Sequence, residues 1–201
     1  MGSLTIIQGP MFSSKSTRLF QELTRFVDVT TEHLETKCIL INHSFDDRNT
    51  EIGVSSHNSS FKGVSKLIEI TQTDDLTSIN VSDYDVIGID EGQFFQNIQP
   101  IYDWVNSGKI VIIAGLIGDA FMKPFGKLME LMPFADNIIQ CHAICVECIK
   151  RKDILITPDV LSGMKAPFTF RLVKTEEQVA VGASESYIPV CRFHYNILKN
   201  L

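Results

Sequence analysis

The sequence lacks any apolar run near the roughly 18 residues that a membrane-spanning helix needs, which argues against a membrane protein. Its first residues, Met1 to Thr5, lack the basic stretch and apolar core of a signal peptide, so we expect a protein that is not secreted. Positive charge is also scarce, because 18 Lys and Arg oppose 24 Asp and Glu and leave a net charge of -6. We therefore predict a cytoplasmic protein that binds neither nucleic acid nor membrane.

What is present indicates an α/β protein with a small appendage, since 201 residues with 44% hydrophobic content allow one such domain. Apolar runs predict strands, and apolar residues at helical spacing predict helices. The expected strands are 4–8, 38–41, 86–91 and 110–114, and the expected helices are about 15–32 and 98–105. This alternation predicts a mostly parallel sheet with helices on both faces. Residues 42–65 are polar and are predicted to form a long loop outside the sheet and helices.

The residue pattern of the chain changes near Cys141, where paired cysteines, prolines and short strand-like runs begin. We place a boundary there. The prediction is a nucleotide-binding α/β domain over residues 1–140 and a small zinc-binding domain over residues 141–201.

A phosphate-binding loop is the first functional motif, although one residue departs from its pattern. The motif G-x-x-x-x-G-K-[ST] is matched by GPMFSSKS, in which Ser14 replaces the second glycine. The loop comprises Gly9, Pro10, Met11, Phe12, Ser13, Ser14, Lys15 and Ser16. It lies between a predicted strand and a predicted helix, as the motif requires, with Lys15 placed to reach phosphates and Ser16 to reach Mg²⁺. The alternative is a serine-rich cap on an ordinary helix.

Two carboxylates end the predicted strand 86–91. Asp90 and Glu91 then lie at the carboxyl edge of the sheet, where open α/β sheets bind ligands. Asp90 suits the orientation of Mg²⁺ or its waters, and Glu91 is free to act as a general base. The alternative is an acid that caps the following helix.

Cysteine and histidine pairs near the C-terminus predict a structural zinc site. Four of the five cysteines follow residue 140, and Cys145-x-x-Cys148 and Cys191-x-x-His194 each have the gap that lets two side chains reach one Zn²⁺. Cys141 and His142 are rival ligands, and reduced thiols without metal are the alternative. Cys38 is expected in the core.

Four segments together resemble the cellular and poxviral class of thymidine kinases. GPMFSSKS, IGIDEGQFF, KPFG and GASESYIPVCRFHY occur in this order and cover the chain from Thr5 to about Tyr195. The resemblance implies a RecA-like phosphate-loop fold and a zinc-binding lasso that closes over the nucleoside. It also implies a homotetramer that transfers the γ-phosphoryl group of ATP to the 5′-hydroxyl of thymidine, with deoxyuridine as a further substrate.

The resemblance also implies roles for single residues. Glu91 falls on the catalytic base. The positions expected near the nucleotide are Asp46, Arg48, Asp90 and Gln93, in addition to the loop. The positions expected near the nucleoside are Phe94, Phe121, Phe125, Thr169, Val179, Val181, Gly182 and Tyr187, and Arg171 lies in the same lasso segment as Thr169. Core packing is the alternative for the three phenylalanines. The chain departs from the family at His194, where cysteine is usual, and by one missing residue before Gly182.

Two other classes of protein share part of this pattern. A phosphate-loop ATPase or switch protein with a zinc module would share the loop, but it would not need the aromatic residues or the lasso. A zinc-ribbon protein that binds nucleic acid would need clustered Lys and Arg, and the net charge of -6 argues against it.

Overall fold

The computed structural model describes residues 1–30, 36–44, 68–150, 157–173 and 186–201. Five residues predicted for the site lie outside these ranges, namely Asp46, Arg48, Val179, Val181 and Gly182. The chain divides into two compact units. The first comprises Met1–Gln8, Lys15–Gly115 and Gly126–Ile139, and the second comprises Gly9–Ser14, Leu116–Phe125 and Gln140–Leu201. Whether residues 1–140 and 141–201 are separate domains stays a prediction.

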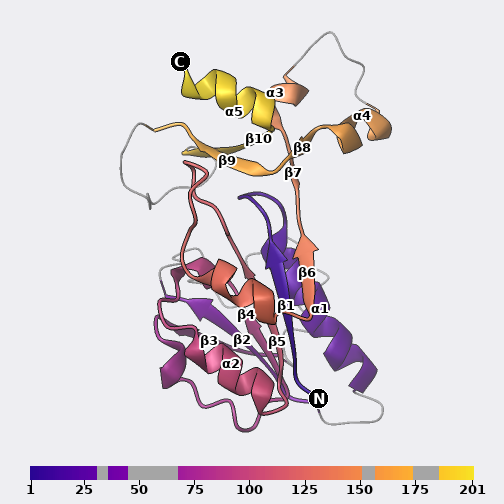
Figure 1. Ribbon diagram of the computed structural model, residues 1–201. Helices are drawn as coiled ribbons and strands as arrows, with labels where there is room; N and C mark the ends of the chain where they lie inside the picture. The colour runs from indigo at the N-terminus through magenta and orange to yellow at the C-terminus, as the bar shows by residue number, and fades with distance from the viewer. Residues whose placement is uncertain (31–35, 45–67, 151–156, 174–185) are drawn as a thin grey trace. The chain divides into compact units, whose positions relative to one another are not determined.

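A six-stranded sheet forms the centre of the first unit (Figure 1). Its strands are β1 (Ser3–Gln8), β2 (Cys38–His43), β3 (Ile68–Thr73), β4 (Val86–Ile89), β5 (Ile110–Gly115) and β6 (Asn137–Gln140), in the order β3-β2-β4-β5-β1-β6. The pairs β1–β5, β2–β3, β2–β4 and β4–β5 are all parallel. The mostly parallel α/β fold predicted from the sequence is confirmed. Parallel strands place their carboxyl ends on one edge, which is where the acidic pair follows β4.

The two longer helices of this unit are α1 (Lys15–Thr30) and α2 (Gln99–Asn106), accompanied by the short 3-10 helices η4 (Leu76–Ser78), η5 (Gly92–Phe94) and η6 (Leu128–Phe134). In α1, Leu19, Leu23 and Val27 recur at helical spacing and are buried. A Cβ at Gly88 in β4 would lie 2.6 Å from Leu23, so the glycine lets α1 approach the sheet closely. A Cβ at Gly2 would meet the carbonyl of Val105 in α2. Gly88 is in register with Thr5 of β1 through Ile112 of β5, so these positions share one face of the sheet. Gly2 lies three residues before Thr5 and therefore continues β1 on the other face, so α1 and α2 cover opposite faces.

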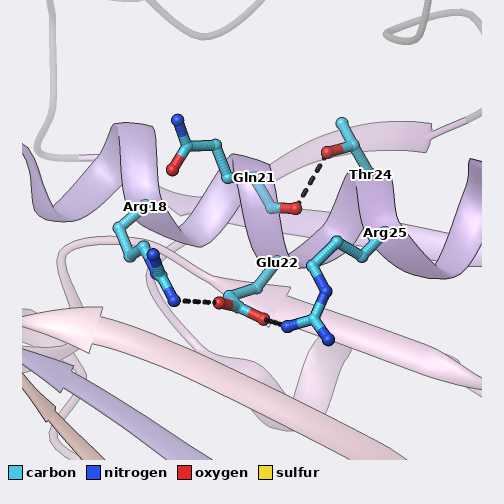
Figure 2. Close-up of polar contacts among 5 residues, drawn as sticks. All are labelled: Arg18, Gln21, Glu22, Thr24 and Arg25. Atoms are coloured by element: carbon cyan, nitrogen blue, oxygen red, sulfur yellow. Dashed lines mark hydrogen bonds and ion pairs between the residues drawn. The ribbon is translucent and has the colours of Figure 1, made fainter.

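Charge pairing on α1 surrounds one carboxylate, as Figure 2 shows. Glu22 is only 8% exposed, and Arg18 and Arg25 reach its two oxygens at 2.7 and 2.6 Å. The spacings of four and three residues put all three side chains on one stretch of the helix. The nearby Thr24 hydroxyl donates to the carbonyl of Gln21 at 2.8 Å.

Each expected strand and helix has a counterpart in the structure, but one strand boundary is wrong and the edge strands β3 and β6 were not predicted. The prediction that the third strand continues through Glu91 is wrong by two residues, because β4 ends at Ile89 and Glu91 adopts a left-handed conformation with φ 53°. The edge strand β3 was not predicted, since most of its residues are at least partly exposed and it has only two isoleucines.

The second unit consists of two small antiparallel sheets and short helices. Its elements are β7 (Ala143–Ile144), α3 (Val146–Ile149), α4 (Pro158–Gly163), β8 (Lys165–Ala166), β9 (Phe168–Arg171), β10 (Tyr187–Val190) and α5 (Arg192–Lys199). β7 pairs with β8, and β9 pairs with β10. One small core, which includes Ala143, Cys145, Val190 and Tyr195, joins both sheets to α5.

Replacing Gly126 by alanine should destabilise the protein more than the same change at Gly108. Both glycines have positive φ, 61° and 99°, so each alanine loses roughly 1–2 kcal/mol of backbone energy. At Gly108 the new Cβ meets nothing within 4 Å, whereas at Gly126 it would lie 1.9 Å from the carbonyl oxygen of Gln93. Urea unfolding of both variants measures the difference. Equal losses would contradict the close approach at Gly126.

Candidate functional site

The phosphate loop contains two residues in the left-handed conformation. Ser14 has φ 61° and Phe12 has φ 63°. A positive φ at the position of the missing glycine is what the motif predicts, so Ser14 carries the strain that glycine would avoid. The Ser13 hydroxyl donates to the carbonyl of Pro10 at 2.8 Å and is buried. Ser13 therefore closes the turn of the loop.

The loop is tied to other segments of the second unit. The N–H of Met11 donates to the Thr169 hydroxyl of β9 at 3.0 Å. At Gly9 a Cβ would lie 2.6 Å from the carbonyl oxygen of Cys141, so only glycine fits there. Cys141, one of the rival zinc ligands, thus lies against the phosphate loop.

The acidic pair of the first unit meets the start of α1. Asp90 is 9% exposed, and its carboxylate accepts hydrogen bonds from the Ser16 hydroxyl and from the N–H of Glu91, the latter at 2.9 Å. Burial and the adjacent charge of Glu91 raise the pKa of Asp90 to about 6, while Ser16, the Glu91 N–H and the charge of Lys15 act in the opposite direction. Lys15, Ser16, Asp90 and Glu91 are therefore brought together as predicted from the motifs.

Glu91 has a defined carboxylate orientation. It precedes η5, but its side chain makes no capping hydrogen bond, so the capping alternative does not hold. Instead the Gln93 amide donates to Glu91 Oε2 at 2.6 Å. Gln93 is 1% exposed, while Glu91 is partly exposed. A buried amide thus orients a carboxylate that solvent or substrate can still reach.

His43 at the end of β2 belongs to the same neighbourhood and was not predicted. Its ring lies 5.4 Å from that of Phe94 and 4.7 Å from that of Phe95, centroid to centroid. Burial lowers the pKa of His43, with the charges of Asp74 and Glu91 opposing the shift. In the sequence His43 lies two positions after the predicted strand 38–41, in the polar segment 42–65, and no motif marks it.

Aromatic residues of the second unit surround Arg171 of β9. Its guanidinium lies 5.4 Å from the centre of the Phe121 ring and 5.3 Å from that of Tyr187, and it donates to the Tyr187 hydroxyl at 3.0 Å. Phe121 is 42% exposed and Phe125 is partly buried, so neither is a plain core residue. Phe94 belongs to the first unit and is also partly buried. Arg171 is the member of this cluster that motif matching did not assign to the site.

Three cysteines and one histidine converge in the second unit. The ligand atoms of Cys145, Cys148, Cys191 and His194 all lie within 4.8 Å of one another. His194 Nδ1 is 3.5, 3.5 and 3.3 Å from the sulfurs of Cys145, Cys148 and Cys191. The sulfurs of Cys148 and Cys191 are 3.9 Å apart. A tetrahedron with Zn–S near 2.3 Å has edges of about 3.8 Å, so the donor set fits Zn²⁺ with Nδ1 as the histidine ligand.

Three further residues singled out from the sequence, Cys141, His142 and Cys38, lie outside this cluster. Cys141 and His142 are not members of the cluster among the residues that the structure describes. Cys38 is 2% exposed, and burial, followed by the charge of Asp85, raises the pKa of its thiol to about 11. It is therefore the core cysteine that was expected.

The fold and the motif define a mostly parallel α/β protein with a phosphate loop and a Cys₃His cluster. The family model described as thymidine kinase matches residues 2–195, and the chain belongs to the thymidine kinase family. This confirms the family, and with it the kinase class of enzyme, that the four motifs indicated.

Relatives from viruses and from a bird match along nearly the whole chain. The thymidine kinase of vaccinia virus (strain Ankara) is 33% identical over 195 residues, which covers 96% of this chain and 97% of the relative. That of Yaba monkey tumor virus (strain VR587) is 34% identical over 203 residues, covering 99% and 97%. The protein named "Thymidine kinase, cytosolic" of Gallus gallus is 32% identical over 197 residues, covering 96% and 77%. Among the described residues, no helix combines the length and the apolar character needed to cross a membrane.

Replacing Ser14 by glycine should tighten ATP binding. The change removes a Cβ from a residue with φ 61°, which relieves about 1.4 kcal/mol and corresponds to as much as a tenfold lower Kd. Calorimetry with ATP measures the effect. Thymidine binding to the same variant is the internal control and should not change. An equal or higher Kd for ATP would show that the loop accommodates serine without cost.

The purified protein should contain one zinc per chain, and His194→Ala should lose it. His142→Ala removes an exposed histidine outside the cluster and should keep the metal, so the two variants form a matched pair. His194→Cys should also keep zinc, because a Cys₄ set is an ordinary structural site. Metal analysis of each protein gives the result. Active protein without zinc, or zinc loss in His142→Ala, would contradict the assignment.

Proposed function

We propose that this member of the thymidine kinase family transfers the γ-phosphoryl group of ATP to the 5′-hydroxyl of thymidine, with deoxyuridine as a second substrate. The observation that carries the proposal is the group formed by Lys15, Ser16, Asp90 and Glu91 within the first unit. It combines a cation and a hydroxyl at a helix start with one buried and one accessible carboxylate. Phosphoryl transfer requires positioning and charge neutralisation, and this group supplies both.

In this proposal the nucleotide phosphates bind at the phosphate loop. The backbone N–H groups of the loop, except at Pro10, which has none, and the positive end of α1 face the phosphates, and Lys15 contacts the outer ones. The hydroxyl of Ser16 and the carboxylate of Asp90 lie within hydrogen-bonding distance of each other, and such hard oxygen donors suit Mg²⁺. Mg²⁺, when bound, neutralises charge on the phosphates. Asp46 and Arg48 are proposed to lie near them as well.

Glu91 is the proposed general base. Its carboxylate is partly exposed and is held by Gln93, so it can accept the proton of the 5′-hydroxyl without first having to be oriented. A positioned base contributes roughly 10²–10⁴ in rate. Asp90 is less suited to this role, because it is buried and already accepts two hydrogen bonds.

The nucleoside is proposed to bind among the aromatic residues and the lasso. Thymine presents a carbonyl, an N–H and a second carbonyl, which backbone groups can pair, and its methyl group and ring suit apolar and aromatic side chains. The residues proposed for this role are Phe94, Phe121, Phe125, Thr169, Val179, Val181, Gly182 and Tyr187. An exposed ring such as Phe121, with a guanidinium over one face, suits stacking on a base.

The proposal also covers the role of the zinc, the oligomeric state and the location of the protein in the cell. Four protein ligands leave no position for a catalytic water, so the zinc is structural, and it joins the residues that precede and follow the lasso. We further propose that the chain assembles as a homotetramer and acts in the cytoplasm. The resemblance to the family supports the tetramer, and the name of the Gallus gallus relative supports the location.

Formation of ADP from ATP with each of the four deoxynucleosides in turn tests the proposed function. Of the four deoxynucleosides we expect only thymidine to give ADP, and we expect weaker turnover when deoxyuridine is tested as a fifth nucleoside. ADP formation that is independent of any nucleoside would instead indicate a phosphate-loop ATPase or switch protein.

Glu91→Gln should keep the fold and ATP affinity and lose at least about 10² in kcat, since only the proton acceptor is removed. Glu130→Gln is the matched control, because it makes the same change at an exposed position of η6 and should retain full activity. Steady-state kinetics of the two variants decide the role. Turnover of Glu91→Gln within about threefold of the parent would place the base elsewhere.

A further inference from the structure

Tyr195 connects the metal cluster to a distant loop of the second unit. It lies in the first turn of α5, which starts after Cys191 and contains His194, so two of the four metal ligands are its near neighbours in sequence. Its N–H donates to the carbonyl of Cys191 at 2.9 Å. The backbone of Tyr195 is therefore fixed by the same turn that presents the metal ligands.

The side chain of Tyr195 is buried and makes one long-range hydrogen bond. Its hydroxyl donates to the carbonyl oxygen of Ala120 at 2.8 Å, across 75 positions in the sequence. The ring is 5% exposed and packs near Phe168 and Phe170, with centroid distances of 5.9 and 5.5 Å. Cys145 belongs to the same core. The hydroxyl thus extends from the core that contains the clustered cysteines to the backbone beside Phe121.

The loop that receives this bond is a compact turn. The Asp119 carboxylate is 7% exposed and accepts from the N–H groups of Phe121 and Lys123 at 2.8 and 2.9 Å. Met122 follows with φ 60° and packs against the core that contains Tyr195. Both neighbours of Phe121 are therefore anchored, Ala120 by a hydrogen bond and Met122 by packing, while the Phe121 ring itself stays 42% exposed.

We propose that Tyr195 is a positioning residue for the nucleoside, because its hydrogen bond to Ala120 fixes the backbone that presents the Phe121 ring. The inference rests on the proposed function, in which Phe121 contacts the nucleoside. A ring held in place before the ligand arrives spares the ordering cost that a mobile ring would add to binding. The Cys₃His cluster then supports the loop 116–125 as well as the two ends of the lasso.

Tyr195→Phe isolates the hydroxyl, since the ring that fills the core is retained. The carbonyl of Ala120 is left buried without this donor, and a lost neutral hydrogen bond corresponds to about a threefold to tenfold change in an equilibrium constant. We expect KM for thymidine to rise by that factor, with KM for ATP and the zinc content unchanged. Tyr102→Phe is the matched control, because it removes an exposed hydrogen bond from a tyrosine hydroxyl to the carbonyl of Glu130, at 3.2 Å in the first unit.

A double-mutant cycle with Phe121→Ala shows whether Tyr195 acts through that ring. If it does, adding Tyr195→Phe to Phe121→Ala should change KM for thymidine by less than about twofold. Equal effects in both backgrounds, or a parallel loss of zinc and ATP affinity, would overturn the inference in favour of a general structural role.

A measurement that needs no catalysis separates this inference from the proposed function. Phe121→Trp places an indole at the loop tip. Trp104, the single tryptophan of the natural sequence, contributes the same fluorescence to every variant compared. Time-resolved anisotropy of that indole should report faster local motion when Tyr195→Phe is added, and no change when Tyr102→Phe is added. Unchanged motion with Tyr195→Phe would overturn the inference. Failure of the parent enzyme to phosphorylate thymidine would refute only the proposed function.

Discussion

The burial of the Asp90 carboxylate is the constraint on which the first unit depends. A carboxylate that is 9% exposed loses most of its hydration and must find partners within the protein. Those partners are the N–H of Glu91, the hydroxyl of Ser16 and the charge of Lys15. They reach Asp90 only because β1 and β4 both run parallel to β5 and end on the same edge of the sheet. The parallel order of the strands is therefore what allows the buried Asp90 carboxylate to find its partners.

The second unit meets a different physical limit. Its sheets have two strands each, and a two-stranded sheet is marginally stable in water. Its core is correspondingly small, so a metal bound by residues on both sides of the lasso can supply folding energy that apolar burial does not. The Tyr195 side chain belongs to this same core. The metal cluster and the Tyr195 side chain thus share one core.

Local patterns predicted most of the sheet and the metal ligands, whereas long-range contacts could not be predicted. The strand β5 is a continuous apolar run, and β1 has the apolar residues Leu4, Ile6 and Ile7. The two-residue gap in Cys145-x-x-Cys148 and in Cys191-x-x-His194 lets both members of each pair reach one metal. The edge strand β3 was missed because its exposure leaves it with few apolar residues. Arg171 and Tyr195 have no local signature, because their partners lie 16 and 75 positions away.

Backbone strain is concentrated where the chemistry is proposed. In the part of the chain that the structure describes, the non-glycine residues with positive φ are Phe12, Ser14, Glu91 and Met122. Two lie in the phosphate loop, one is the proposed base, and one follows Phe121. Each such residue costs of order 1–3 kcal/mol and persists only where the surroundings determine it. At Glu91 and Met122 those surroundings are visible, as the Gln93 amide and the core around Tyr195. The same segments were singled out from side-chain motifs alone, so backbone geometry and side-chain motifs agree on the segments proposed for function.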